Sequence, residues 1–217
     1  NWFSKGKNST MAIRSKRDLE IVLSKLKVYE KPSFLLEQYP TPSNIAAEWV
    51  WNIAMKGEVA GKTIADAGCG PGILGLGLLL MGAKRVIFID KDADIMQTCQ
   101  ENYRTIRKEY EIGAAEFITH DISLFDGEVD IMVQNPPFGT KQEHADKKFL
   151  EKAFAAVLIV YSMHKWSTQK FVEAIAKDHG FKITDVWRYE FPIKAVFKFH
   201  EKPLQMVDVG LWRMMKT

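Results

Sequence analysis

Cysteine is scarce in this sequence, which has two cysteines among 217 residues. Neither Cys69 nor Cys99 belongs to a CxxC pair or a cysteine–histidine cluster. The sequence therefore predicts no metal site and no disulfide framework, and a reducing, cytoplasmic location is expected. Long apolar runs are also missing, because none reaches the roughly 20 residues that a membrane span needs. The first residues lack the apolar core of a signal peptide, so no membrane association is expected.

A strong excess of one charge is missing as well. The formal net charge is +3 and the isoelectric point is near 8.7, so the average charge does not indicate a nucleic-acid-binding protein. Hydrophobic residues make up 47% of the chain, enough for a substantial core. We expect a single domain over residues 1–217, with N-terminal helices in 11–60 and the core in 61–217. Residues 1–10 are expected to be a non-native or disordered extension before Met11.

Apolar periodicity predicts an alternation of strands and helices after two N-terminal helices at 12–27 and 43–55, the second capped by Ser43. Strands are expected at 63–67, 86–90, 116–119, 129–133 and 157–161, and helices at 72–81, 92–109, 149–156 and 168–178. This alternation is typical of an α/β fold with a mostly parallel central sheet covered on both faces. Three further strands, expected at 181–190, 194–200 and 207–214, would form an antiparallel C-terminal edge.

A glycine-rich turn follows the first expected strand, where residues 66–72 read Asp-Ala-Gly-Cys-Gly-Pro-Gly. The turn opens a helix, so its backbone can approach a ligand and the free N–H groups of the helix face that ligand. Gly70, Gly72 and Gly75 match the dinucleotide pattern GxGxxG, which is weak evidence alone. Asp66 distinguishes a dinucleotide from S-adenosylmethionine as the ligand. A carboxylate at this position would repel a pyrophosphate but attract the amino and sulfonium groups of S-adenosylmethionine. We therefore expect S-adenosylmethionine as the cofactor, bound by Asp66 and Gly70.

Acidic residues also end the next two expected strands. Asp90 occupies the place where an acid binds the ribose hydroxyls of an adenosine cofactor, although a helix cap is the alternative. Asp121 can accept a hydrogen bond from the adenine amino group, while Ile122 offers a backbone N–H and an apolar wall. A simple turn residue is the alternative reading of Asp121.

The sequence Asn135-Pro136-Pro137-Phe138 follows the strand expected at 129–133. An exocyclic amine is a poor nucleophile, because its lone pair is delocalised into the ring. The Asn135 side-chain oxygen and the Pro136 carbonyl can accept its two hydrogens and direct the lone pair at a methyl group, and Asn135 would also border the cofactor. The prolines keep the loop rigid, and Phe138 offers a face for stacking of the base. We expect these four residues to be catalytic in a Rossmann-like S-adenosylmethionine-dependent methyltransferase fold.

The chain resembles the archaeal and eukaryotic methyltransferase-like family that forms N6-methyladenosine in small-subunit ribosomal RNA. The segments that carry the resemblance are LEQYPT at 36–41, the turn at 66–72, NPPFGT at 135–140, YSMHK at 161–165 and FKFH at 197–200. The resemblance implies that Gln38 and Thr41 close over the cofactor. It also implies a pocket lined by Gly68, Pro71, Ile73, Asp90, Asp121 and Ile122.

The resemblance also implies partners. Eukaryotic members of the family use a small zinc-binding activator protein, and the substrate would be ribosomal RNA.

Pro71 departs from the cysteine that is often found at its position in the family. This difference should change the wall of the loop rather than its function.

Basic residues around these motifs agree with an RNA substrate, because clustered lysines attract phosphates without sequence specificity. The candidate RNA contacts are Lys141, Lys147, Lys165, Lys198 and His200. Acidic residues lie between them, so a solvated surface is the alternative for any single lysine. His164 and His200 are expected to be structural or RNA-contacting rather than catalytic bases.

Three other functions compete with RNA adenine methylation. A protein methyltransferase acting on a glutamine amide shares the Asn-Pro-Pro logic, but such enzymes usually place tyrosine where this chain has Phe138. A non-catalytic nucleotide-binding or assembly protein could share the fold. An NAD-dependent oxidoreductase ranks last, since no set of residues suggests hydride chemistry.

Overall fold

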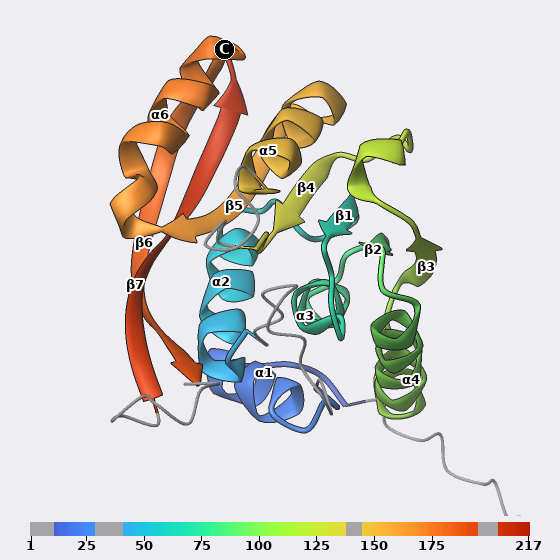
Figure 1. The fold of residues 1–217 in the computed structure, drawn as a ribbon. Helices are drawn as coiled ribbons and strands as arrows, with labels where there is room; N and C mark the ends of the chain where they lie inside the picture. The colour runs from blue at the N-terminus through green and yellow to red at the C-terminus, as the bar shows by residue number, and fades with distance from the viewer. Residues whose placement is uncertain (1–10, 29–40, 138–144, 195–203) are drawn as a thin grey trace, which may run out of the picture.

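The structure, a computed structural model, describes residues 11–28, 41–137, 145–194 and 204–217 (Figure 1). Its α-helices are α1 (Lys16–Leu23), α2 (Ser43–Met55), α3 (Ile73–Leu80), α4 (Ala93–Glu109), α5 (Ala145–Ala156) and α6 (Gln169–Asp178). Two short 3₁₀ helices are η1 (Ile122–Leu124) and η2 (Trp166–Thr168). The strands are β1 (Thr63–Ala67), β2 (Arg85–Asp90), β3 (Ala114–Thr119), β4 (Ile131–Gln134), β5 (Ile159–Lys165), β6 (Phe181–Lys194) and β7 (Leu204–Lys216).

The seven strands that the structure describes form one sheet in the order β3-β2-β1-β4-β5-β7-β6. Strands β1 to β5 are parallel to one another, whereas β7 pairs antiparallel with both β5 and β6. The strand order reverses at β1, which has β2 on one side and β4 on the other. In such sheets ligands bind beyond the carboxyl ends of the strands at the point of reversal. A ligand site is therefore expected at the carboxyl ends of β1, β2 and β4.

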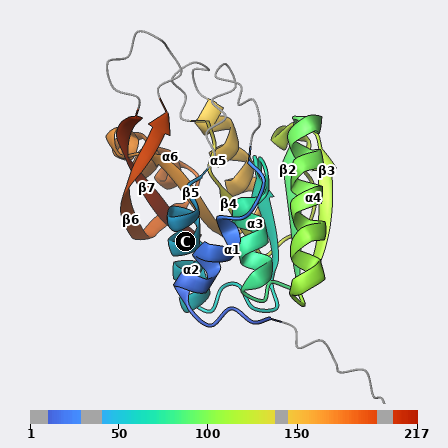
Figure 2. The same ribbon diagram turned by 90° about the horizontal axis from the view of Figure 1, so that it is seen from below.

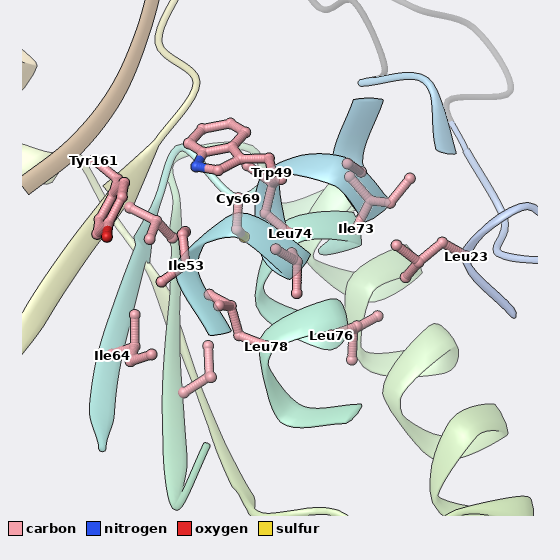
Figure 3. Close-up of a cluster of buried hydrophobic side chains, with 14 of the residues drawn as sticks. Leu23, Trp49, Ile53, Ile64, Cys69, Ile73, Leu74, Leu76, Leu78 and Tyr161 are labelled. Carbon is pink, nitrogen blue, oxygen red and sulfur yellow. The ribbon is translucent and has the colours of Figure 1, made fainter. Parts of the chain in front are cut away.

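Helices cover the sheet on both faces, with α5 and α6 on one side and α1 to α4 on the other (Figures 1 and 2). Almost every side chain of α3 is buried, because α3 packs against β1 and β2 of the sheet and is flanked by α1 and α2. Figure 3 shows Leu74 and Leu78 of α3 packed near Trp49 and Ile53 of α2. A helix that is apolar all round is typical of such a central position, and it anchors the glycine-rich turn that precedes it.

The predicted alternation of strands and helices is confirmed, with differences at the element ends. The first helix is shorter than the range predicted for it, and Ser15 caps its N-terminus by accepting a hydrogen bond from the Asp18 N–H at 3.1 Å. The prediction that Ser43 caps the second helix is wrong. Pro42 holds the N-cap position without a side-chain hydrogen bond, and Ser43 is the first helical residue.

The prediction of three C-terminal strands is also corrected. One strand, β6, continues through Pro192 to Lys194 and pairs with β7 along its whole length. Proline is tolerated there because β6 is an edge strand, whose backbone N–H groups on the outer side need no partner in the sheet. Residues 195–200 of the predicted middle strand lie outside the described residues. The antiparallel C-terminal edge itself is confirmed.

Candidate active site

The turn between β1 and α3 depends on glycines with left-handed backbone conformations. Gly68, Gly70 and Gly72 have φ values of 69°, 54° and 87°, which side chains disfavour. The Gly68 N–H donates to the carbonyl of Ile89 at the end of β2, at 2.8 Å. A Cβ atom at Gly72 would lie 2.5 Å from the Sγ of Cys99 in α4. Neighbouring elements therefore hold this turn closely, and the turn follows the carboxyl end of β1, where a ligand is expected.

Asp66 lies directly beneath this turn and is almost fully buried, with 1% of its surface exposed. Its Oδ2 accepts a hydrogen bond from the Gly75 N–H at 2.8 Å. Burial, reinforced by the nearby charge of Asp90, raises the pKa of Asp66 to about 7 despite that hydrogen bond. No basic side chain of the described residues forms an ion pair with Asp66. The site thus offers a buried carboxylate that a cationic ligand group would stabilise in its charged form.

Gly75 makes the approach of α3 to this carboxylate possible. A Cβ atom at Gly75 would lie 2.9 Å from Asp66 Oδ2 and 2.3 Å from the ring of Phe88. The third glycine of the GxGxxG pattern is therefore needed for close packing of the helix against the strands, and the pattern alone does not imply a dinucleotide.

Asp90 ends β2 as predicted, and both of its oxygens bind backbone groups. Oδ2 accepts from the Gly70 N–H at 2.9 Å, and Oδ1 accepts from the Asp92 N–H at 3.0 Å. Burial raises the pKa of Asp90. Asp90 therefore connects β2 to the glycine-rich turn, and the ribose contact predicted for it would add to this structural role.

Asp121 and Ile122 lie after β3, also as predicted. Asp121 caps η1 by accepting from the Ser123 N–H at 2.9 Å. Its Oδ1 also lies 2.7 Å from the Nζ of Lys148 in α5, and this lysine holds the pKa of Asp121 well below its usual range. Ile122 is buried with 4% exposure, which suits an apolar wall.

Pro71 and Ile73 are both buried at the start of α3. Asn102, which was not among the predicted site residues, connects Pro71 to the N-terminal part of the chain. The Asn102 amide donates to the carbonyls of Pro71 and Lys27, both at 2.9 Å, and its oxygen accepts from the Lys27 N–H at 2.9 Å. The signal was present in the sequence, because Asn102 occupies the apolar stripe of a helix, between Cys99 and Ile106. A polar residue on such a stripe needs buried partners.

The reactive segment follows β4, next to the start of α2. The Asn135 Nδ2 donates to the Oγ1 of Thr41 at 3.0 Å, which fixes the orientation of the amide. The Asn135 Oδ1 is buried and accepts no hydrogen bond from any described residue. Pro136 is buried and Pro137 is half-buried. A buried carbonyl oxygen without a partner is costly, so its position beside a proline-rigid backbone indicates an acceptor for a ligand.

Five of the predicted site residues lie outside the described residues: Gln38, Phe138, Lys141, Lys198 and His200. Lys147 is exposed on α5, where its Nζ lies 3.7 Å from a carboxylate oxygen of Glu151. Lys165 is half-buried at the end of β5. His164 is buried with 2% exposure, so of the two roles predicted for it the structural one fits and the RNA contact does not.

No helix in the described ranges is long and apolar enough to cross a membrane. No group of three or more histidine, cysteine, aspartate or glutamate side chains in them could hold a metal ion.

The fold and the site together define a methyltransferase of the S-adenosylmethionine-dependent class, with a glycine-rich turn after β1, an acid at the end of β2 and an Asn-Pro-Pro segment after β4. The chain belongs to the methyltransferase small domain family, whose model matches residues 50–159. Over 211 residues it is 34% identical to the rRNA N(6)-adenosine-methyltransferase Mettl5 of Drosophila melanogaster, covering 94% of this chain and 97% of that protein. The predicted family resemblance is therefore confirmed.

Solved structures agree with this assignment. A Pyrococcus horikoshii protein, provisionally described as an RNA methyltransferase, matches with a TM-score of 0.85 and 38% identity, covering 94% of this chain and 99% of that one. The magnesium protoporphyrin IX methyltransferase of Synechocystis, solved with S-adenosylmethionine bound, matches with a TM-score of 0.64 and 14% identity over 96% of this chain and 100% of that one. The second likeness concerns the fold alone, and the predicted fold class is confirmed.

Proposed function

We propose that this protein transfers the methyl group of S-adenosylmethionine to the N6 amine of an adenosine in ribosomal RNA. The observation that carries the proposal is the buried Asn135 Oδ1, which accepts no hydrogen bond from any described residue at the end of a strand beside the sheet reversal. Support for the RNA substrate comes from relatives that are named rRNA N(6)-adenosine-methyltransferases.

The reaction needs an amine whose lone pair is redirected rather than a strong base. In adenine the N6 lone pair is delocalised into the ring, and the amine carries two hydrogens. The Asn135 Oδ1 would accept one hydrogen and the Pro136 carbonyl the other, which draws the nitrogen toward tetrahedral geometry. The hydrogen bond from Asn135 to Thr41 already fixes the amide, so the acceptor is preorganised. The surplus proton of the methylated amine is lost to water.

The described residues also fit the cofactor. S-adenosylmethionine supplies an electrophilic methyl group on a positively charged sulfur. Asp66 offers the only buried carboxylate of the described residues beneath the glycine-rich turn, and its charge suits the cationic groups. Asp90 would accept from the ribose hydroxyls, while Asp121 and Ile122 would border the adenine. Phe149 and Cys99 leave no room for side chains at Gly68 and Gly72, so the cofactor would meet the backbone of the turn.

Lys147 and Lys165 are the described candidates for RNA contact. Lys165 is the last residue of β5, whose carboxyl end lies at the same edge of the sheet as Asn135, and Lys147 lies in the first turn of α5. The surface pair of Lys147 with Glu151 is too weak to keep that lysine from a phosphate. The reaction itself requires an adenine that is unpaired or flipped out of a helix. An activator protein and a cytoplasmic location stay predictions from the sequence.

The proposed function is tested by transfer of labelled methyl groups from S-adenosylmethionine to total RNA and, in parallel, to total protein. After digestion of the RNA to nucleosides, mass analysis should identify N6-methyladenosine in the ribosomal RNA fraction. Label in methylated glutamine would instead indicate a protein methyltransferase. Label in neither, with the cofactor bound, would contradict the proposal for the protein acting alone, and a repeat with added activator protein would test that partner.

The raised pKa of Asp66 predicts pH-dependent cofactor binding. Folding raises this pKa from 3.8 to about 7, so in the free protein the ionised carboxylate costs stability as the pH rises from about 4 to about 7. A cationic cofactor favours the ionised form, so its affinity should rise as the pH increases through 7. Because the ionised fraction falls tenfold per unit below the pKa, the dissociation constant at pH 6 should exceed that at pH 8 by roughly tenfold.

Calorimetric titrations at pH 6, 7 and 8 measure this dependence. Asp66→Asn is the matched control, since it keeps the shape and an acceptor for the Gly75 N–H but cannot ionise. Any dependence that persists in this variant belongs to the cofactor's own amino group. Equal pH dependence in both proteins would show that Asp66 does not face the cationic groups.

A further inference from the structure

A chain of buried polar side chains lies on the α5 side of the sheet. The Gln134 Nε2 donates to the Ser162 Oγ at 3.0 Å, and the Ser162 Oγ lies 2.7 Å from the His164 Nε2. On the other side of the ring, the His164 Nδ1 lies 3.7 Å from an oxygen of Asp146. Gln134, Ser162 and His164 are at most 2% exposed. These four side chains are called the buried relay below.

The buried relay connects the end of β4 to the start of α5. Gln134 is the last residue of β4 and immediately precedes Asn135, whereas Asp146 lies in the first turn of α5. Ser162 and His164 both belong to β5, where Ser162 is the register partner of Gln134. The end of β4 is therefore hydrogen-bonded to β5 through Ser162, and the start of α5 faces the same strand through the contact of Asp146 with His164.

The protons of the buried relay have one consistent order. Burial lowers the pKa of His164, so the ring is neutral and carries a single N–H. The carboxylate of Asp146 favours that proton on Nδ1. The unprotonated Nε2 then accepts from the Ser162 hydroxyl, which in turn accepts from the Gln134 amide N–H. Every N–H and O–H group in this order points from Gln134 toward Asp146. The Gln134 Oε1 therefore takes no part in the chain of hydrogen bonds.

Aromatic side chains seal the buried relay from water. The Trp212 ring packs edge-on against His164 with 5.9 Å between centroids and stacks on Trp166 at 5.8 Å. Gly210, the register partner of His164, makes room for this arrangement, because a Cβ atom there would lie 2.3 Å from Trp212. Hydrogen bonds in such a dry environment are strong, and an interrupted chain is costly.

The start of α5 also contacts the cofactor side of the sheet. Lys148 pairs with Asp121 at 2.7 Å, and the Phe149 ring packs against Gly68, where a Cβ atom would lie 3.1 Å away. Asp146, Lys148 and Phe149 therefore fix one helical turn to β5, to η1 and to the glycine-rich turn. Lys148 and Phe149 hold the cofactor side of this turn independently of Asp146, so loss of the Asp146 contact should be felt at the reactive segment.

We propose that Ser162, His164 and Asp146 are positioning residues that act through Gln134 and hold the end of β4 against the start of α5, so that the Asn135 acceptor is aligned with the amine. This inference rests on the proposed function. A purely structural role explains the observations less well, because the Gln134 Oε1 is buried without a hydrogen bond from any described residue. An apolar side chain at that position would avoid this cost. Buried polar atoms without hydrogen bonds are expected mainly at functional sites, where the function requires the polar side chain.

Three variants test the inference by steady-state kinetics of methyl transfer to RNA. Asp146→Ala and Ser162→Ala should lower kcat on the order of 10- to 100-fold, the effect expected from a small misplacement of a reacting group. The dissociation constant for S-adenosylmethionine should change less than about threefold, since no relay residue is assigned to the cofactor. Asp146→Asn should restore most of the lost kcat, because its amide oxygen can occupy the place of the carboxylate oxygen that faces the His164 Nδ1 at 3.7 Å.

Asp185→Ala is the matched control. Asp185 is a partly buried carboxylate of β6 that pairs with Lys56 at 2.7 Å, and it lies two strands away from β5. This variant should lose thermal stability without losing kcat. Wild-type kcat in Asp146→Ala and Ser162→Ala would overturn the inference while leaving the proposed function intact.

Hydrogen–deuterium exchange gives a readout that does not depend on activity. In Asp146→Ala and Ser162→Ala, peptides covering residues 131–135 and 145–150 should exchange at least several times faster than in the wild type, while peptides from β6 and β7 should not change. Unchanged exchange in 131–135 and 145–150 would overturn the inference even if the wild-type protein methylated no RNA. An inactive wild type with the expected change in exchange would contradict the proposed function and leave the buried relay as the anchor of the segment.

Discussion

Asn135→Ala should lower kcat for methyl transfer to RNA by at least 100-fold while leaving cofactor affinity within about threefold of the wild type. Removal of one preorganised group that stabilises developing charge typically costs 100- to 1,000-fold, and Asn135 Oδ1 is the buried acceptor assigned to the amine. The affinity should persist because the cofactor contacts are assigned mainly to Asp66, Asp90 and the glycine-rich turn. Single-turnover methylation of RNA measures the first quantity, and calorimetric titration measures the second.

Two further variants identify which contact of Asn135 matters. Thr41→Val removes the hydroxyl that fixes the amide at 3.0 Å but keeps the Oδ1 acceptor, so it should reduce kcat much less than Asn135→Ala. Asn52→Ala is the matched control, because Asn52 is a half-buried asparagine of α2 whose Nδ2 donates to the Tyr189 hydroxyl at 3.1 Å. It should leave kcat unchanged. If Asn135→Ala keeps more than a tenth of the wild-type kcat, the acceptor role assigned to Oδ1 is wrong.

The strand ends of the site could be predicted from the sequence, and the reason is geometric. In a parallel sheet the carboxyl ends of all strands lie at one edge, so any polar residue directly after an apolar run is placed near that edge. Asp66, Asp90, Asp121 and Asn135 each follow such a run, and the structure brings them to the ends of β1 to β4. The order of these polar residues along the chain was therefore enough to predict that they lie close together, without knowledge of the packing.

The connections between distant segments could not be predicted in the same way. The bonds of Asn102 to Lys27 and Pro71 join residues separated by 75 and 31 positions, and no local pattern encodes such a pairing. The same holds for the buried relay, where the register of β4 with β5 decides that Gln134 meets Ser162. The single long strand β6 was missed because Pro192 reads as a strand end, whereas its place at the sheet edge depends on the order of all strands.

The roles of Asp66 and Asp90 were predicted only in part. The sequence indicated acids that face a cofactor, but the structure shows both carboxylates bonded to backbone N–H groups as well. The double role follows from the glycines, because the left-handed backbone of Gly70 and the absence of a side chain at Gly75 let the two N–H groups reach the carboxylates. An acid of this kind supports the shape of the site and offers charge to the ligand, so its removal should affect both.

Asp90→Ala should therefore weaken binding of S-adenosylmethionine by about 1–3 kcal/mol, the cost of losing a charged hydrogen-bond partner, which is roughly 5- to 150-fold in the dissociation constant. Two losses contribute. The ribose hydroxyls lose their proposed acceptor, and the Gly70 N–H loses the carboxylate that holds it at 2.9 Å. Calorimetric titration with S-adenosylmethionine measures the total effect, and titration with its ribose-lacking fragment methionine isolates the contribution of the loosened turn.

Asp130→Ala is the matched control for this variant. Asp130 is a carboxylate whose Oδ2 accepts from the Thr63 N–H at 2.8 Å, but this contact lies at the amino end of β1, on the opposite edge of the sheet from the glycine-rich turn. Loss of one backbone-binding carboxylate in that place should lower stability and leave cofactor affinity unchanged. Equal affinity in Asp90→Ala and Asp130→Ala would place the ribose contact on another residue. A large loss in both would mean that global stability, rather than the contact at the end of β2, controls cofactor binding.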